Sequence, residues 1–162
     1  MHLKNKKIYL IVIALIIAAD QASKWLLVKF VPLESTRDVL KGFLRLWHVR
    51  NSGAVWGFFQ DHDGGLVPKL ITGLAVAALL IVAWFFLRAD RRERLELTAY
   101  AVILGGALGN IIDRLRLGYV VDFIDVHVKT WHWPTFNVAD SCITIGVLLL
   151  ALSLWRGKCT PS

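Results

Sequence analysis

Two aspartates, Asp122 and Asp140, have neighbours that make them candidates for acid–base chemistry. Asp122 lies in the strand-like segment 119–128, and Asp140 lies near the start of an apolar segment at 137–155. Two carboxylates a few ångströms apart cannot both ionise easily, so they share a proton and hold one acid and one base. The base can activate a water against a peptide carbonyl, and the acid can protonate the leaving amine. We therefore predict an aspartic hydrolase site that needs no metal and no cofactor.

The start of the last apolar segment suggests which aspartate carries the proton. Asn137 is of a residue type that caps helix N-termini, which would place Asp140 in the first turn of a helix. The positive end of the helix dipole stabilises a carboxylate at that position. We expect Asp140 to be the ionised member and Asp122 the protonated one, with apparent pKa values that belong to the pair.

The composition indicates that these residues belong to a polytopic membrane protein. Of 162 residues, 56% are hydrophobic and 19% are charged, which is more apolar and less charged than a typical soluble domain. Apolar runs long enough to cross a bilayer predict one integral-membrane domain over residues 1–162, with a membrane all-α core. The four expected transmembrane helices cover about 8–28, 66–87, 96–112 and 138–155.

The loop between the first two spans has β-sheet character at about 40–60. Residues 43–49 are rich in aromatic and β-branched types, Asn51-Ser52-Gly53 is a turn signal, and 54–59 is apolar again. This pattern predicts a β-hairpin or small sheet lying on the membrane, followed by a flexible connector at 61–65.

Basic residues predict the orientation in the membrane. The short segments 1–7, 88–94 and 156–162 carry a much higher density of Lys and Arg than the two long loops. The positive-inside rule then puts both termini and the 88–94 loop in the cytoplasm, and both long loops outside. The net charge of +7 is explained by this anchoring, and no motif indicates a nucleic-acid partner.

Several of these charged residues have structural explanations as well. Asp140 would serve as a first-turn helix residue and Asp122 as a solvated loop residue. Asp20 with Lys24 would form an intramembrane ion pair, and Asp113 with Arg114 an ion-paired helix end. Asp125 is expected to face solvent, because its strand parity is opposite to that of Asp122. His127 and His132 lie near aspartates and are weighed as zinc ligands, but they fit no H-E-x-x-H pattern. The position of His132 between two tryptophans is typical of an interface anchor.

Five motifs in order resemble the prolipoprotein signal peptidase (signal peptidase II) family over nearly the whole chain. They are D-Q-x-x-K at 20–24, N-S-G-A at 51–54, G-G-A-L-G-N-I-I-D-R at 105–114, V-V-D-F at 120–123 and F-N-V-A-D-S at 136–141. One departure is Val55-Trp56, where the family often has Ala-Phe, and this change affects the packing expected for the loop.

The resemblance implies a fold of four transmembrane helices with a small extracytoplasmic β-cradle, and an aspartyl endopeptidase. Its catalytic residues fall on Asp122 and Asp140. Other motif positions that support the site or the substrate are Asp20, Lys24, Asn51, Gly105, Asn110, Arg114 and Asn137.

The implied substrate is a diacylglyceryl-modified prolipoprotein, cut on the amino side of its lipobox cysteine. The implied setting is the bacterial inner membrane, with the active site on the outer face, contact with membrane lipid, sensitivity to globomycin, and a monomer. The alternatives are a small ion or proton transporter that uses Asp20, Asp122 and Asp140 as a carboxylate relay, and a non-catalytic assembly or chaperone subunit.

Overall fold

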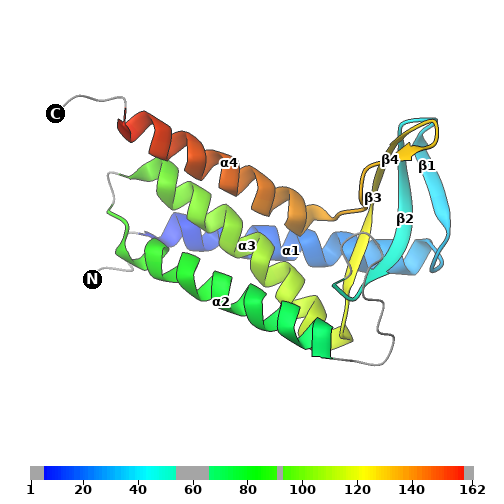
Figure 1. Cartoon of the computed structure of the whole chain (residues 1–162), viewed down its shortest axis with the longest axis horizontal. Coiled ribbons are helices and arrows are strands. Elements are labelled where there is room, and N and C mark those ends of the chain that lie inside the picture. Colours follow the sequence, from blue (N-terminus) through cyan, green and yellow to red (C-terminus); the bar gives the residue numbers. More distant parts are fainter. Residues whose placement is uncertain (1–5, 54–65, 91–92, 159–162) are drawn as a thin grey trace.

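The computed structural model describes residues 6–53, 66–90 and 93–158, and places four long helices beside a small sheet (Figure 1). Each helix is long and apolar enough to cross a membrane. This confirms the predicted fold class, a four-helix membrane core with a small β-structure. The helices are α1 (Lys7–Phe30), α2 (Leu66–Arg88), α3 (Arg94–Leu117) and α4 (Val138–Lys158).

Helix α3 is the centre of the bundle and packs against α1, α2 and α4. Its glycines allow close approach: a Cβ on Gly105 would lie 2.8 Å from the Ile16 Cβ of α1. The helix continues five residues beyond the predicted end at 112 and stops at Gly118, whose N–H bonds the Arg114 carbonyl. The predicted end was too early because Asp113 is not at a helix terminus but is buried inside the bundle.

The sheet is antiparallel throughout, in the order β1-β2-β3-β4. The first hairpin differs from the predicted one. The sequence predicted that the strand at 43–49 would pair with a segment after it, whereas in the structure β2 pairs with β1, which precedes it. Residues 54–65, including the predicted apolar run at 54–59 and the connector at 61–65, lie outside the described residues. The strands are β1 (Thr36–Leu40), β2 (Leu44–Asn51), β3 (Val120–Val128) and β4 (Trp131–His132).

The sheet lies at one end of the bundle, opposite the start of α1 and the end of α4 (Figure 1). A small core fixes it there: Leu27 and Val31 at the end of α1 pack with Val121 and Phe123 of β3, and all four are buried. A second core lies toward the other end of the bundle, around Phe86 near the end of α2 and residues in the first half of α3. Because β3 follows α3 directly and packs on α1, its position relative to both helices is fixed.

The segment between β4 and α4 runs back along β3. The Phe136 carbonyl accepts hydrogen bonds from the N–H groups of Phe123 and Ile124, and the Phe136 N–H donates to Ile124. This pairing delivers residue 137, and with it the N-terminus of α4, to the side of β3 at Asp122.

Candidate active site

Asn137 connects the two aspartates Asp122 and Asp140 directly. Its side-chain amide Nδ2 donates to Asp122 Oδ1 at 2.7 Å. Its backbone N–H donates to Asp140 Oδ2 at 3.2 Å. Asn137 is fully buried and Asp122 is only 2% exposed. The structure therefore brings one carboxylate from β3 and one from α4 onto the same residue.

The N-terminus of α4 is a capping box. The Asn137 side-chain Oδ1 accepts the N–H of Asp140 at 2.9 Å, while the Asp140 carboxylate reaches back to the Asn137 N–H. The expected N-cap role of Asn137 is confirmed. The structural explanation for Asp140 is also correct, since it is a first-turn residue. Asp140 can be a capping residue and a candidate site residue at the same time, because the capping contact uses only one carboxylate oxygen, Oδ2, and orients the carboxylate.

Two further amides complete the contacts of the aspartates. Asn51, at the end of β2, donates from Nδ2 to Asp122 Oδ2 at 2.8 Å. Asn110 of α3 donates from Nδ2 to Asp140 Oδ1 at 2.7 Å. Each of the four carboxylate oxygens thus accepts a hydrogen bond from an uncharged amide N–H. Among the described residues, no positively charged side chain forms an ion pair with Asp122 or Asp140.

Asp122 has a strongly raised pKa. Burial is the main cause, and the nearby charge of Asp140 adds to it, while the hydrogen bonds from Asn51 and Asn137 act in the opposite direction. The result is a pKa of about 6 for Asp122. A carboxyl group with this pKa is partly protonated near neutral pH, as general acid catalysis requires.

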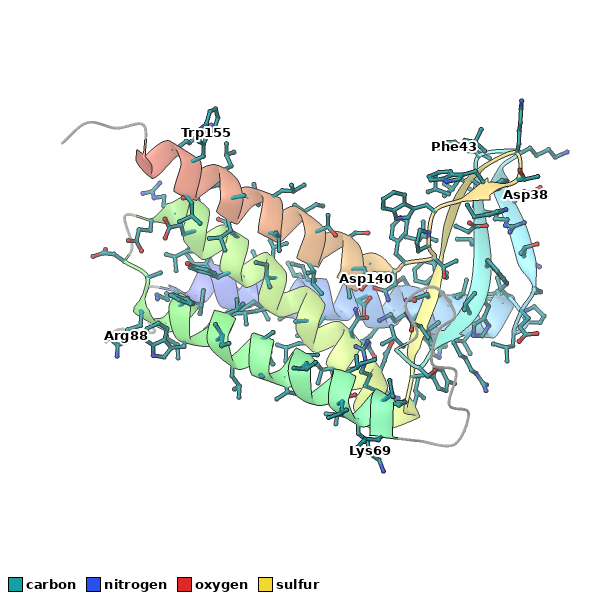
Figure 2. All side chains as sticks on the ribbon, viewed as in Figure 1. Asp38, Phe43, Lys69, Arg88, Asp140 and Trp155 are labelled. Carbon is teal, nitrogen blue, oxygen red and sulfur yellow. The ribbon has the colours of Figure 1, made fainter. Side chains whose placement is uncertain are left out.

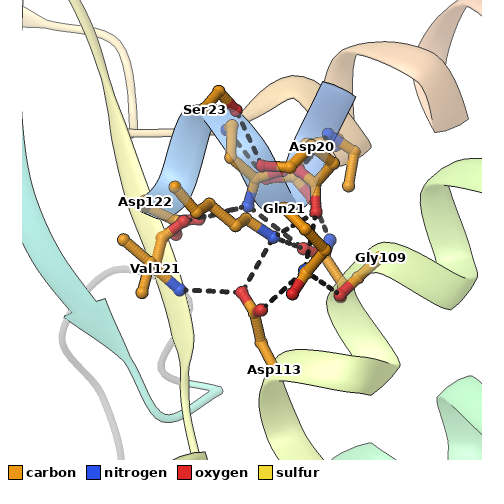
Figure 3. Close-up of polar contacts among 12 residues, drawn as sticks. Asp20, Gln21, Ser23, Gly109, Asp113, Val121 and Asp122 are labelled. Carbon is orange, nitrogen blue, oxygen red and sulfur yellow. Dashed lines mark hydrogen bonds and ion pairs between the residues drawn. The ribbon is translucent and has the colours of Figure 1, made fainter. Parts of the chain in front are cut away.

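Lys24 joins Asp20 of α1 to Asp113 of α3, and Figure 3 shows these two aspartates close to Asp122. Its Nζ lies 2.8 Å from Asp20 Oδ2 and 2.8 Å from Asp113 Oδ2, and it donates to Asn110 Oδ1 at 2.9 Å. The predicted Asp20–Lys24 pair is confirmed. The predicted Asp113–Arg114 pairing is wrong, because adjacent residues on a helix point in different directions and Asp113 points toward α1. Asn110 also contacts Asp140, so this single residue connects the buried ion cluster to the aspartate pair.

Asp20 also caps α4 from a different helix. Its Oδ1 accepts the backbone N–H of Ala139 at 3.0 Å, which is one of the first-turn donors that have no partner within the helix. Gly109 of α3 makes room for this carboxylate, since a Cβ there would lie 2.6 Å from Asp20 Oδ2. Gln21 completes the cluster by donating to Asp113 Oδ1 at 2.9 Å. The resemblance did not assign Gln21, Asp113 or Gly109 to the site, although all three lie inside the quoted motifs.

An apolar groove leads to Asp140. It encloses about 290 Å³ between α2, α3 and α4. Its polar end holds Asn110, Arg114 and Asp140, and Figure 2 shows Asp140 at the end of α4 nearest the sheet. The rest is lined by small and aliphatic residues: Ala75, Ala78, Leu79, Val82, Ile103, Ala107 and Ile143. Among the predicted support residues, Gly105 lies apart from this centre, at the α1–α3 contact.

One residue of the sheet is not where the sequence predicted. Asp125 was expected to face solvent, but it is completely buried. It forms an ion pair with Arg45, and His132 Nδ1 donates to its Oδ1 at 3.0 Å. The parity argument was correct that Asp125 and Asp122 lie on opposite faces of β3, but on the second face the side chains of Arg45 from β2 and His132 from β4 contact Asp125. His132 lies between the exposed Trp131 and Trp133, and its role as an interface anchor stays a prediction.

Comparison with known proteins agrees with this geometry. The sequence profile of the family described as Signal peptidase (SPase) II matches residues 12–156. The chain belongs to the signal peptidase II family. A protein named lipoprotein signal peptidase from Syntrophotalea carbinolica is 42% identical over 156 residues, which is 96% of each chain. Another of that name from Geobacter metallireducens is 40% identical, over 95% of this chain and 94% of the other.

Solved structures also resemble this signal peptidase II chain. One, a bacterial membrane enzyme determined by the in meso method at 2.3 Å resolution, aligns with a TM-score of 0.83 and 28% identity, covering 96% of this chain and 92% of the other. A second, at 1.9 Å resolution, aligns with a TM-score of 0.79 and 29% identity, covering 91% and 92%. Both are described as enzymes, which gives no support to the transporter alternative.

Proposed function

We propose that this chain is an aspartic endopeptidase that removes signal peptides from diacylglyceryl-modified prolipoproteins, with Asp122 and Asp140 as its catalytic residues. Family membership supports the reaction class. The observation that carries the residue assignment is that Asn137 donates a hydrogen bond to each of the two carboxylates. Asp122 is buried and Asp140 is half-buried, and two carboxylates held on the same residue in this way are placed to share one proton.

The proposed step divides the work between the two residues. Asp140, stabilised as an anion by the first turn of α4, takes a proton from a water whose oxygen attacks the scissile carbonyl carbon. Asp122, with a pKa of about 6, donates a proton to the carbonyl oxygen. The tetrahedral diol then breaks its C–N bond as a proton from Asp140 reaches the leaving amine, and one hydroxyl of the diol returns its proton to Asp122. The four amide contacts hold both carboxylates without neutralising either one.

The groove supports a lipidated substrate. Its long apolar part lies between helices that cross the membrane, and its polar end is at Asp140. An acyl chain or the apolar part of a signal peptide would be stabilised there by burial and would hold the scissile bond near the carboxylates. We propose membrane lipid and the prolipoprotein as partners, cleavage on the amino side of the lipobox cysteine, and one integral-membrane domain over residues 1–162 that acts as a monomer.

The proposed setting is the bacterial inner membrane, with the termini in the cytoplasm and the sheet and carboxylates at the outer face. The distribution of basic residues supports this orientation. Tryptophans agree with it: Trp131 and Trp133 are exposed at the sheet, while Trp84 and Trp155 are exposed on the helices, with Trp155 at the opposite end of the molecule (Figure 2).

The decisive experiment uses the purified chain in detergent with a diacylglyceryl-modified lipobox peptide. Wild type should cleave it, and Asp122→Asn and Asp140→Asn should each lose at least about a thousandfold in kcat, because either change removes the shared proton system. Asp38→Asn is the matched control, since Asp38 is an exposed carboxylate on β1.

Two outcomes would overturn the assignment. If Asp140→Asn processed the peptide at the wild-type rate, the carboxylate would have no chemical role. If the double variant Asp122→Asn/Asp140→Asn lost ion flux in vesicles but still cut the peptide, the two aspartates would belong to an ion or proton relay and not to a peptidase site.

A further inference from the structure

A second cluster of ionisable groups lies on the face of β3 that Asp122 does not use. Asp125 and His127 come from β3, and His132 comes from β4. The pairing of the strands places His127 opposite His132. One carboxylate oxygen and one imidazole nitrogen from each histidine all lie within 4.8 Å of one another. Two histidines and one carboxylate are ligands typical of zinc and similar divalent metals.

One atom in this cluster has no partner. His127 is only 8% exposed, and its Nδ1 is buried without a hydrogen bond among the described residues. An unsatisfied buried polar atom is costly and calls for an explanation, such as an ion that occupies the site. This Nδ1 is directed at Asp125, whose Oδ2 lies 3.9 Å away, too far for a hydrogen bond.

The separations fit coordination of a single ion. Two ligand atoms at tetrahedral zinc are roughly 3.4 Å apart, given bond lengths near 2.1 Å. Here His132 Nδ1 lies 3.2 Å from Asp125 Oδ2, and His127 Nδ1 lies 3.9 Å from the same oxygen. The two values lie on either side of the ideal, so small side-chain rotations would admit the ion. The His132 side chain is 37% exposed, which gives the ion a path from solvent and leaves a coordination position for water.

Arg45 is the main competitor for such an ion. It stands opposite Asp125 in the β2–β3 pairing and forms an ion pair with Oδ2. The hydrogen bonds to Oδ1 come from His132 alone among the described residues. The Arg45 side chain is 25% exposed, so it can move toward solvent when a cation binds the Asp125 carboxylate at Oδ2. The ion pair therefore weakens metal binding without blocking it.

We propose that Asp125, His127 and His132 form a binding site for one divalent transition metal of the zinc class, separate from the Asp122–Asp140 pair. The ion would link β4 to β3 through side chains, in addition to the two backbone-paired positions that join them. It would thereby fix the short β4 strand that carries the exposed Trp131. This site is independent of the peptidase proposal, because no residue is shared with it.

The test uses the full chain without an affinity tag, purified in detergent and treated with chelator. Titration with Co²⁺ should produce the visible absorption of a tetrahedral site at one equivalent, and Zn²⁺ should abolish it. Zn²⁺ should also raise the midpoint of thermal unfolding, since it binds the folded state. His127→Gln/His132→Gln should weaken binding by at least about tenfold, whereas the exposed-carboxylate control Asp38→Asn should bind as wild type does.

Arg45→Gln provides a variant that keeps all three ligands. It should tighten Co²⁺ binding several-fold, because the competing cation is removed. Three results would overturn the proposal: no absorption and no thermal shift in wild type with Zn²⁺ well above the protein concentration, unchanged binding in the double histidine variant, or weaker binding in Arg45→Gln. Unchanged binding in the double variant would assign the metal to another histidine, such as His2, His48 or His62.

Discussion

The carboxylate of Asp20 on α1 accepts the backbone N–H of Ala139 on α4 at 3.0 Å, so the first helix of the chain caps the last one. The same carboxylate forms the ion pair with Lys24 at 2.8 Å. Asp20 is completely buried. It therefore stabilises the position of α4, and with it Asp140, without a contact of its own to the reacting groups.

Asp20→Ala should lower the free energy of unfolding by about 1–3 kcal/mol, because it leaves the Ala139 N–H and part of the Lys24 charge without partners. Asp20→Asn should lower it less, since an oxygen acceptor remains. Thermal unfolding in detergent measures both, with Asp38→Ala on exposed β1 as the control. A fully stable Asp20→Ala protein would contradict the capping role.

The stability of the protein should depend on pH through Asp122. Its pKa in the folded chain, about 6, is above the ordinary value of 3.8, so the folded state binds this proton more tightly than the unfolded state does. Its contribution is fully present below about pH 4 and is lost as pH rises through 6, by up to about 3 kcal/mol.

Unfolding midpoints measured from pH 4 to pH 8 for wild type and Asp122→Asn check this. The difference between the two proteins should change with pH in that window, whatever the absolute stability of the variant. A constant difference would show that the pKa of Asp122 is not raised by folding.

Asn51 should set the alkaline limit of activity. Its hydrogen bond to Asp122 Oδ2 stabilises the charged carboxylate and lowers its pKa. Asn51→Leu removes that bond, so the carboxyl group should keep its proton to a higher pH, and the alkaline limb of kcat/KM should move up by about one pH unit. The neighbouring change Ser52→Ala is the control. A limb that moves down, or does not move, would mean that Asp122 does not act as the acid.

Gly109 should not tolerate a side chain. Gly109→Ala puts a Cβ 2.6 Å from Asp20 Oδ2, and the resulting shift should cost about 1–3 kcal/mol of stability. Gly73→Ala is the matched control in α2, where nothing lies within 4 Å of the new atom. This control should be neutral or should stabilise by up to about 1 kcal/mol, as expected for Ala in a helix. Equal effects of the two changes would contradict the close α1–α3 contact.

The sequence predicted the helices well because long apolar runs are a strong signal, and α2 begins at the predicted residue 66. Strand β1 was missed because all five of its residues are exposed, so it has no alternation of buried and exposed positions. Asp125 was assigned to solvent because strand parity identifies a face but does not say what covers it. In this fold β4, which is only two residues long, supplies part of that cover.

Asn137 illustrates which contacts could not be predicted from the sequence. Its type and position predicted an N-cap, and that is correct. Its second contact, to Asp122, depends on the chain after β4 returning along β3, which is a tertiary arrangement with no local signal. Lys24 is similar: a partner four residues away was predictable, but its contact with Asp113 requires α1 and α3 to be packed.

The order of the elements has a consequence for biosynthesis. Asp122 on β3 is synthesised before α4, and its partner Asn137 and the second carboxylate, Asp140, belong to the last helical segment. Asp20 and Lys24 of α1 and Asp113 of α3 are present earlier. Synthesis as far as β3 therefore supplies all three residues of the ion cluster but only one carboxylate of the pair, so the proposed hydrolysis requires that α4 has been made as well.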